Sequence, residues 1–364
     1  MNYVVTLGEV MTRFRVPGHG RLAQALPGNL GVTFGGAEAN VAASISLLGG
    51  KSRFVTALPT NTIADACISD LKSVGIDTSS IQRVTAGRMG SYYLEVGANQ
   101  RASSVVYDRD HSSVSLLGPD AYDWEKAFMG ADWFHVTGIT PALSQEAAET
   151  TIFAVREAKR RGLTVSCDLN FRGKLWRWED GTEPRELARR TMEGVVPYVD
   201  LLIGNEGDAD DVLGVRAGET KVESGSLEID RYPDVAKQIV KRFSNVQKVA
   251  ITLRESVSAS HNRWGAMLYA AETGEAYFAP MRDGRYSPYE ITDIVDRVGA
   301  GDSFGAALIF ASRDSKLTGD LQRELSFAVA ASALCHSVDG DFNYVSRAEI
   351  ETLAAGDESG RVRR

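Results

Sequence analysis

The chain alternates short β-branched, apolar runs with segments whose apolar residues recur at helical spacing, and this alternation limits the folds open to it. The runs Trp133–Thr137 and Leu163–Leu169 are typical of buried strands. Between them, Gln145–Arg161 has the spacing of a helix, and Gly162 follows as its stop. Repeated strand–helix units predict an α/β fold, here a three-layer αβα sandwich with a mainly parallel central sheet.

The same alternation extends over most of the chain. The other expected strands are Tyr3–Val10, Arg53–Ala57, Leu201–Ile203, Lys248–Leu253 and Tyr289–Val295. The other expected helices are Ala37–Leu48, Asn61–Val74, Pro184–Gly194, Pro233–Phe243, Ser303–Ser312 and Leu321–His336.

Two segments interrupt this pattern. Met11–Gly36 is irregular and rich in glycine, and Met89–Tyr107 alternates apolar and polar residues without a helix nearby. We expect a small β-sheet lid built from about residues 11–36 and 89–110 on a main domain of residues 1–355. Gly214–Arg231 is expected to be a surface insertion, and residues 356–364 a disordered tail.

Charge and cysteine usage exclude several classes of partner. The 364 residues carry 40 basic and 48 acidic side chains, a formal net charge of −8, which argues against a nucleic-acid binder. The chain lacks the run of roughly 20 apolar residues that a membrane helix needs. The cysteines are few, far apart and form no CxxC pair, as in reduced, cytoplasmic proteins. Small-molecule partners are therefore expected.

The strongest local motif is Asp296-Arg-Val-Gly299-Ala300-Gly301-Asp302, which precedes the apolar helix Phe304–Ala311. Glycines let the backbone approach a ligand closely, and the unpaired N–H groups of a helix start favour an anion. A capping aspartate after a glycine turn is the simpler alternative. Capping alone leaves the two glycines and the second carboxylate unexplained.

Three further motifs carry polar side chains at expected helix starts or strand ends. Gly35 and Gly36 open a helix that holds Asn40, although a tightly packed helix start would need the same small residues. Asp168-Leu-Asn170-Phe-Arg172 follows a buried strand, where ligands bind in parallel sheets. Asn205-Glu-Gly-Asp208 follows the next strand. Local Asx-type bonding or a helix cap would explain the last two motifs as well.

Taken together, GGAEANVA and DRVGAGDSF resemble the two signature regions of the ribokinase-like (PfkB) carbohydrate kinases. The resemblance covers roughly residues 3 to 355. The segments DLNFRGKLW, ITLRESVSASHN and ALCHSVDGDFN are similar to those of family members that phosphorylate 2-keto-3-deoxygluconate. The resemblance therefore implies ATP-dependent phosphorylation of this sugar acid at its C6 hydroxyl, with Mg²⁺ as cofactor and a monovalent cation as a further candidate.

The resemblance also implies roles for individual residues. Asp302 would be the general base, and the amides of Gly299, Ala300 and Gly301 would form the anion hole. Asn205 and Asp208 would arrange Mg²⁺ through water. The residues implied for the sugar acid are Gly35, Gly36, Asn40, Tyr93, Tyr107, Arg109, Arg172 and Asp302. Those implied for the nucleotide are Asn170, Asn205, Thr252, Arg254, Gly299 and Gly301.

Guanidinium groups suit a carboxylate substrate, because they bind it through two parallel hydrogen bonds. The alternative for Arg109 is a solvated surface charge. Two departures from the family pattern affect the nucleotide side: Asp296-Arg297 stands where the family has Asp-Thr, and Arg254–Arg263 is expected to form a longer loop.

Other functions stay open at this point. A kinase of the same fold could act on a neutral sugar such as fructose or on a nucleoside, and a kinase scaffold could serve as a non-catalytic nucleotide or sugar sensor. An NAD-dependent oxidoreductase is disfavoured because the glycine spacing does not match a dinucleotide fingerprint. The edges of an open β lid would also allow a homo-oligomer through the lid.

Overall fold

The computed structural model describes residues 1–216, 229–357 and 360 of the chain. Within them, ten strands form a central sheet, and β16 (Tyr289–Ile291) pairs with β12 at its side. The other nine strands follow in the order β13 (Glu275–Ala279), β12 (His261–Ala270), β11 (Lys248–Ser258), β10 (Leu201–Gly204), β9 (Thr164–Asp168), β8 (Ala131–Thr137), β1 (Tyr3–Leu7), β4 (Lys51–Pro59) and β5 (Ile81–Val84).

The sheet is parallel from β5 to β11 and antiparallel where β12, β13 and β16 join it. This confirms the expected α/β fold with a mainly parallel sheet. Adjacent residues of each strand point to opposite faces, so that Val4 and Val5 enter different apolar clusters. Apolar side chains are therefore buried on both faces of the sheet.

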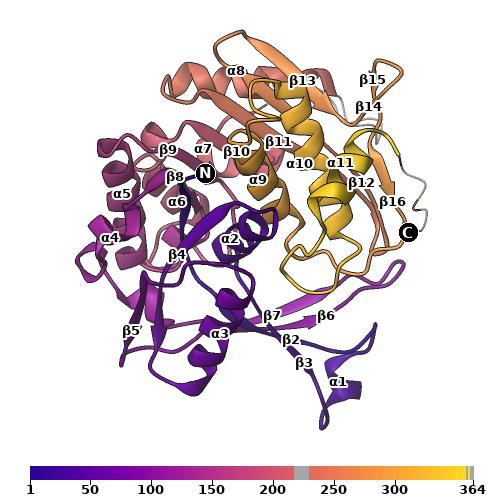
Figure 1. The fold of residues 1–364 in the computed structure, drawn as a ribbon. Helices are drawn as coiled ribbons and strands as arrows, with labels where there is room; N and C mark the ends of the chain where they lie inside the picture. Colours follow the sequence, from indigo (N-terminus) through magenta and orange to yellow (C-terminus); the bar gives the residue numbers. More distant parts are fainter. Residues whose placement is uncertain (217–228, 358–359, 361–364) are drawn as a thin grey trace.

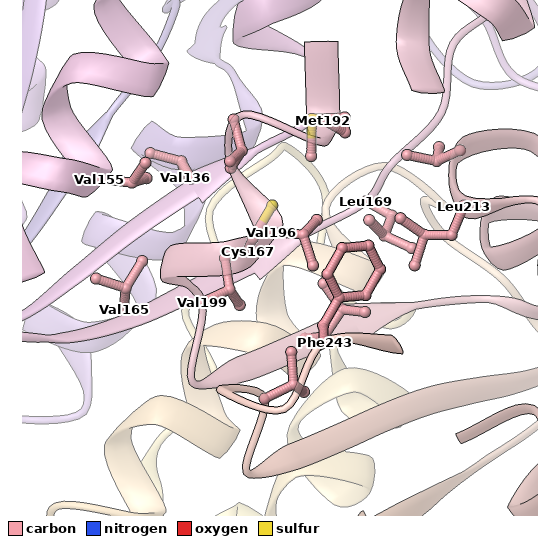
Figure 2. Packing of buried hydrophobic residues seen from close by; sticks show 14 of the residues in the cluster. Val136, Val155, Val165, Cys167, Leu169, Met192, Val196, Val199, Leu213 and Phe243 are labelled. Atoms are coloured by element: carbon pink, nitrogen blue, oxygen red, sulfur yellow. The ribbon is translucent and has the colours of Figure 1, made fainter. Parts of the chain in front are cut away.

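Helices cover the two faces in two groups (Figure 1). One face carries α4 (Trp124–Phe128), α5 (Gln145–Arg160), α6 (Pro184–Met192), α7 (Glu206–Leu213) and α8 (Tyr232–Arg242). The other carries α2 (Ala37–Leu47), α3 (Thr62–Ser73), α9 (Ala300–Ala311), α10 (Leu321–Cys335) and α11 (Arg347–Ala354). Figure 2 shows the core on the first face, where valines and leucines of β8, β9 and the helices interlock.

A second, smaller sheet forms the lid below one edge of the molecule (Figure 1). Its strands follow in the order β3 (Gly31–Gly35), β2 (Met11–Arg15), β6 (Ser91–Glu95) and β7 (Ser104–Asp108), with the short helix α1 (Leu22–Ala25) between β2 and β3. The segment expected to be irregular, Met11–Gly36, thus contains two strands. The lid is the small separate sheet that the alternating segment predicted.

The outer face of the lid bears a row of apolar side chains, one from each strand. Val32, Phe14, Tyr93 and Val106 are successive cross-strand neighbours. The rings of Phe14 and Tyr93 stack at 4.9 Å, whereas Val32 and Val106 are more than half exposed. The expected homo-oligomer through the lid would bury this row, and it stays a prediction.

Three expectations about local structure were wrong or lie outside the described residues. The strand expected over Tyr289–Val295 ends at Ile291, because the amides of Val295 and Asp296 bond to His336 at the end of α10 instead of to a strand. The loop expected over Arg254–Arg263 is a β-hairpin formed by the ends of β11 and β12. Most of the expected insertion (residues 217–228) and most of the expected tail (358–359 and 361–364) lie outside the described residues.

A further β-hairpin, β14 (Met281–Arg282) and β15 (Arg285–Tyr286), follows β13.

Within the described part of the chain, we found no helix that is both long and apolar enough to cross a membrane.

The core on the first face makes a stability prediction. Phe134 is fully buried and meets Phe128 edge to face at 5.2 Å, whereas Phe153 on α5 is 40% exposed. Phe134→Ala should lower the free energy of unfolding by about 3–5 kcal/mol, because it leaves a cavity that the sheet cannot close. The matched control, Phe153→Ala, should cost less than about 1 kcal/mol. Urea denaturation measures both, and equal losses would contradict the assigned core.

Candidate active site

A cavity of about 620 Å³ lies between the lid and the carboxyl ends of the parallel strands. Residues that follow β9 and β10, together with residues of β11, line one side. Lid strands β6 and β7 line another, and the turn before α9 closes the end. Ligands of open parallel sheets bind at this edge, because the loops after successive strands meet there.

The glycine turn before α9 presents backbone amides to this cavity. Gly299 is the N-cap of α9 and has a φ of 84°, a conformation that favours glycine. Ser303 makes the first hydrogen bond within the helix, to the carbonyl of Gly299, at 2.8 Å. The amides of Ala300, Gly301 and Asp302 come before it and are left without helical partners. Free amides at the start of a helix are suited to bind an anion.

Asp302 stands in the first turn of α9 with its carboxylate next to Asn40 of α2. The side-chain amide of Asn40 donates to Asp302 Oδ2 at 2.7 Å and to Asp341 Oδ2 at 3.4 Å. Burial raises the pKa of Asp302 to about 7, with smaller contributions from nearby Asp341 and Glu38, although the Asn40 hydrogen bond works against the rise. A carboxylate with a pKa near neutrality is well suited to accept a proton.

Two arginines predicted to contact the sugar acid lie in different surroundings. Arg109 is 8% exposed, and its Nε donates to Glu9 Oε2 at 2.8 Å, with Nη2 bonded to the same oxygen. The positive charge of Arg109 is therefore largely neutralised by Glu9. Arg172 is exposed at the cavity, and among the described residues it donates only to the carbonyl of its neighbour Phe171, at 3.0 Å. Of these two, Arg172 is the guanidinium that is open to a carboxylate ligand.

A third guanidinium, that of Arg254, lies on the β11 wall. Burial and the nearby charge of Arg172 lower the pKa of Arg254, and Asp208 opposes that change. The Arg254 side chain is exposed at the cavity, and among the described residues it has no acidic partner at hydrogen-bond distance. A guanidinium in this position favours an anionic ligand.

The lid presents Tyr92, not Tyr93, to the cavity. Tyr92 is buried and donates from its hydroxyl to Asp341 Oδ1 at 2.6 Å, while Tyr93 belongs to the outer apolar row. Adjacent residues of a strand face opposite sides, so only one of the two tyrosines can point inward. Tyr107 lines the cavity and pairs directly with Tyr92 across β6 and β7. In this register Tyr92, and not Tyr93, lies on the same face of the lid as Tyr107.

Asn205 and Asp208 form a reciprocal cap at the start of α7. Asn205 Oδ1 accepts from the amide of Asp208 at 3.0 Å, and Asp208 Oδ2 accepts from the amide of Asn205 at 3.1 Å. Asp208 Oδ1 also accepts from the amide of Phe171 at 3.0 Å. The helix-cap alternative is thus what the hydrogen bonds show, and the same two residues also line the cavity.

Acidic side chains gather around this cap. Burial raises the pKa of Asp208, and burial together with Asp208 and Asp302 raises the pKa of Asp168. A cation bound here would relieve the repulsion between these carboxylates. In the described ranges, no cluster of three acidic, histidine or cysteine side chains forms a metal site by itself.

Most residues singled out by sequence converge on this cavity. Those lining it are Gly36, Asn40, Tyr107, Arg109, Asn170, Arg172, Asn205, Asp208, Thr252, Arg254, Gly299, Ala300, Gly301 and Asp302. Gly35 and Tyr93 do not line it, and Gly35 instead packs on the carboxylate of Asp341. The cavity residues that sequence reasoning missed include Glu9, Glu38, Tyr92 and Asp341. Glu9, Glu38 and Asp341 are far apart in the sequence, and only the fold shows them to be neighbours.

Comparison with known proteins adds an independent finding. The model of the pfkB family carbohydrate kinases matches residues 1–343. A relative from Haloferax volcanii, named 2-dehydro-3-deoxygalactonokinase, is 31% identical over 359 residues, which are 98% of each chain. The crystal structure of 2-dehydro-3-deoxygluconokinase from Thermotoga maritima is 42% identical, with a TM-score of 0.85 over 98% of each chain. A putative ribokinase II from E. coli, in complex with ATP and Mg²⁺, shares the fold at 21% identity, with a TM-score of 0.75 over 98% of this chain and 99% of that one.

The glycine turn makes a second prediction. A Cβ on Gly299 would lie 2.5 Å from the carbonyl oxygen of Asp341, whereas a Cβ on Gly301 would meet nothing within 4 Å. Gly299→Ala should destabilise the protein by about 1–3 kcal/mol, because it combines a left-handed backbone with a steric clash. Gly301→Ala is the matched control and should change stability by less than about 1 kcal/mol. Thermal unfolding of the two variants tests this, and equal stability would refute the assigned turn geometry.

Proposed function

The chain belongs to the pfkB family of carbohydrate kinases, and from that membership we propose that it phosphorylates 2-keto-3-deoxygluconate at the C6 hydroxyl to give 2-keto-3-deoxy-6-phosphogluconate. The observation that carries the proposal is the placement of Asp302 beside the amides of Gly299–Gly301, in a cavity that also holds the exposed guanidinium of Arg172. The names of two relatives, a galactonate-type and a gluconate-type kinase, support the substrate class.

In the proposed reaction, Asp302 accepts the proton of the sugar hydroxyl. The hydroxyl oxygen forms a bond to the γ-phosphorus of ATP as the bond from that phosphorus to the β-phosphate bridging oxygen breaks, and ADP leaves with the bonding electrons. Asn40 holds the carboxylate of Asp302 in place through its 2.7 Å hydrogen bond. The amides of the glycine turn stabilise the charge of the transferring group, a role that needs fixed donors more than covalent chemistry.

The acidic surroundings of the α7 cap fit Mg²⁺. Mg²⁺ is usually held by one or two carboxylates, water and substrate phosphates. Asp208 and Asn205 would hold it through water, because each already serves as a capping partner, and Asp168 is the nearby second carboxylate. When bound, the ion would neutralise charge on the phosphates of ATP.

We assign the sugar-acid carboxylate to Arg172. Arg109, which the resemblance also implied for the sugar acid, is held by Glu9. Its guanidinium carbon lies 5.5 Å from the ring centre of Tyr107. Arg109 therefore supports the lid wall of the sugar site and offers less free charge. Arg254 and Thr252, on β11, are assigned to the phosphates of ATP, where the charge of Arg254 would gain a partner.

The general base makes a pH-dependent prediction. Asp302→Asn should lower kcat by about 10²–10⁴-fold, because asparagine cannot accept the proton. Since only the ionised form of Asp302 is a base and its pKa is about 7, wild-type kcat should fall as the pH drops through 7. Steady-state kinetics between about pH 5 and pH 9, about two units on each side of this pKa, measures both effects. Near-normal turnover of the variant would exclude Asp302 as the base.

Substrate selection makes a further prediction. With ADP release as the readout, 2-keto-3-deoxygluconate or its galactonate epimer should exceed fructose and a nucleoside by about 100-fold or more in kcat/KM. Arg172→Ala should raise KM for the sugar acid by about 10–100-fold, because a charged hydrogen bond is lost. Lys174→Ala is the matched control, since Lys174 is an exposed cation two residues away that does not line the cavity.

These measurements separate the remaining alternatives. Preferred turnover of fructose or a nucleoside would identify a neutral-sugar or nucleoside kinase. Binding of ATP or sugar without product from any sugar would identify a sensor. An unchanged KM in Arg172→Ala, with turnover of the sugar acid intact, would remove Arg172 from the carboxylate site and leave the activity itself in place.

A further inference from the structure

A buried arginine of the lid connects the lid to the glycine turn. Arg13 lies on β2 and is 1% exposed. Its Nη1 donates to Asp341 Oδ1 at 2.5 Å, and its Nη2 forms an ion pair with Asp296. All three side chains are almost fully buried, so this is not a surface ion pair of small effect. A buried charge of this kind is stable only when it is paired, and loss of one partner is costly.

Asp296 and Asp341 each contact the glycine turn directly. Asp296 Oδ1 accepts from the amides of Arg297 and Val298, at 2.7 and 3.1 Å, in the segment that leads to Gly299. The carbonyl of Asp341 occupies the space beside Gly299 where a side chain would lie. The guanidinium of Arg13 therefore holds the two groups that fix the turn from either side.

The same cluster reaches Asp302 through one residue. Asn40 donates to both Asp302 and Asp341, so a shift of Asp341 would move the amide that orients Asp302. The other titratable or charged groups that act on Asp302 are Glu38 of α2, Asp168 at the end of β9, Cys335 of α10 and Arg172 after β9. In this mostly acidic surrounding, Arg13 supplies positive charge from the lid side.

We propose that Arg13 is a positioning residue for phosphoryl transfer: it seats lid strand β2 on the glycine turn and offsets the negative charge of Asp296 and Asp341 next to the general base. The proposal rests on the proposed function, because it assumes that Asp302 is the base. It also makes the lid part of the catalytic geometry, beyond any role in covering the sugar.

Two variants separate the positioning role of Arg13 from the effect of its positive charge. Arg13→Lys keeps a positive charge but cannot bridge both carboxylates, because an ammonium lacks the planar fork of a guanidinium. Its kcat should fall by about 10-fold or more while the acid limb of the pH profile stays at the wild-type position. Arg13→Met removes the charge as well. The uncompensated carboxylates then disfavour ionisation of Asp302, and the acid limb should move to higher pH by about 0.5–1 pH unit.

The matched control is Arg53→Met. Arg53 is also a buried arginine, but it bonds to Asp77 and to the carbonyls of Lys126, Ala127 and Met129, away from the cavity. Its loss should lower the melting temperature and leave the acid limb in place. A simple loss of stability in the Arg13 variants would therefore look like the control and would not move the pH profile.

The results have distinct meanings. A folded Arg13→Met enzyme with the wild-type acid limb would overturn the charge role, and an Arg13→Lys enzyme with wild-type kcat would overturn the positioning role. If Arg13→Met does not fold, the kcat of Arg13→Lys decides the positioning role on its own. Each variant is compared with wild type on one sugar-acid substrate, so absence of wild-type turnover would count against the proposed function and not against Arg13.

Discussion

The burial of α9 is the constraint on which the site depends. Ten of its twelve residues are buried, between the sheet, α2 and α10, so the helix cannot tilt or slide without disturbing the core. Its N-terminal amides are thereby fixed at the edge of the sheet. Preorganised donors of this kind are effective because no reorganisation is needed when charge develops. The Gly299 turn must then fit between this fixed helix and Asp341.

Local charge, not net charge, governs the cavity. The chain carries a net charge of −8, yet its proposed substrates are two anions. Arg109 is neutralised by Glu9, and Arg13 by Asp296 and Asp341, so these two arginines add little attraction for a ligand. Arg172 and Arg254 have no acidic partner at hydrogen-bond distance in the described residues. The attraction for anions is therefore concentrated at the strand ends, where both proposed substrates would meet.

The sequence predicted those features that depend on neighbours along the chain. The parallel sheet, the glycine turn with Asp302 and the polar residues after β9 and β10 all follow from local pattern. The sequence did not predict partners that are far apart along the chain. Arg109 pairs with a residue 100 positions away, and Arg13 pairs with residues 283 and 328 positions away. The resemblance implied Tyr93, whereas Tyr92 lines the cavity. Alternation along a strand shows that two neighbouring residues face opposite sides, but not which of them faces the cavity.

The lid has two faces with opposite requirements. The outer face keeps an exposed apolar row, whereas the inner face buries an arginine and a tyrosine hydroxyl against Asp341. A lid that only excluded water would be most stable with apolar inner residues, because a buried ion pair seldom gains over a hydrophobic contact. Arg13 and Tyr92 instead converge on one carboxylate that also adjoins Gly299 and Asn40. The inner face thus fits the glycine turn in position and charge, so that closure of the lid and geometry of the site depend on the same contacts.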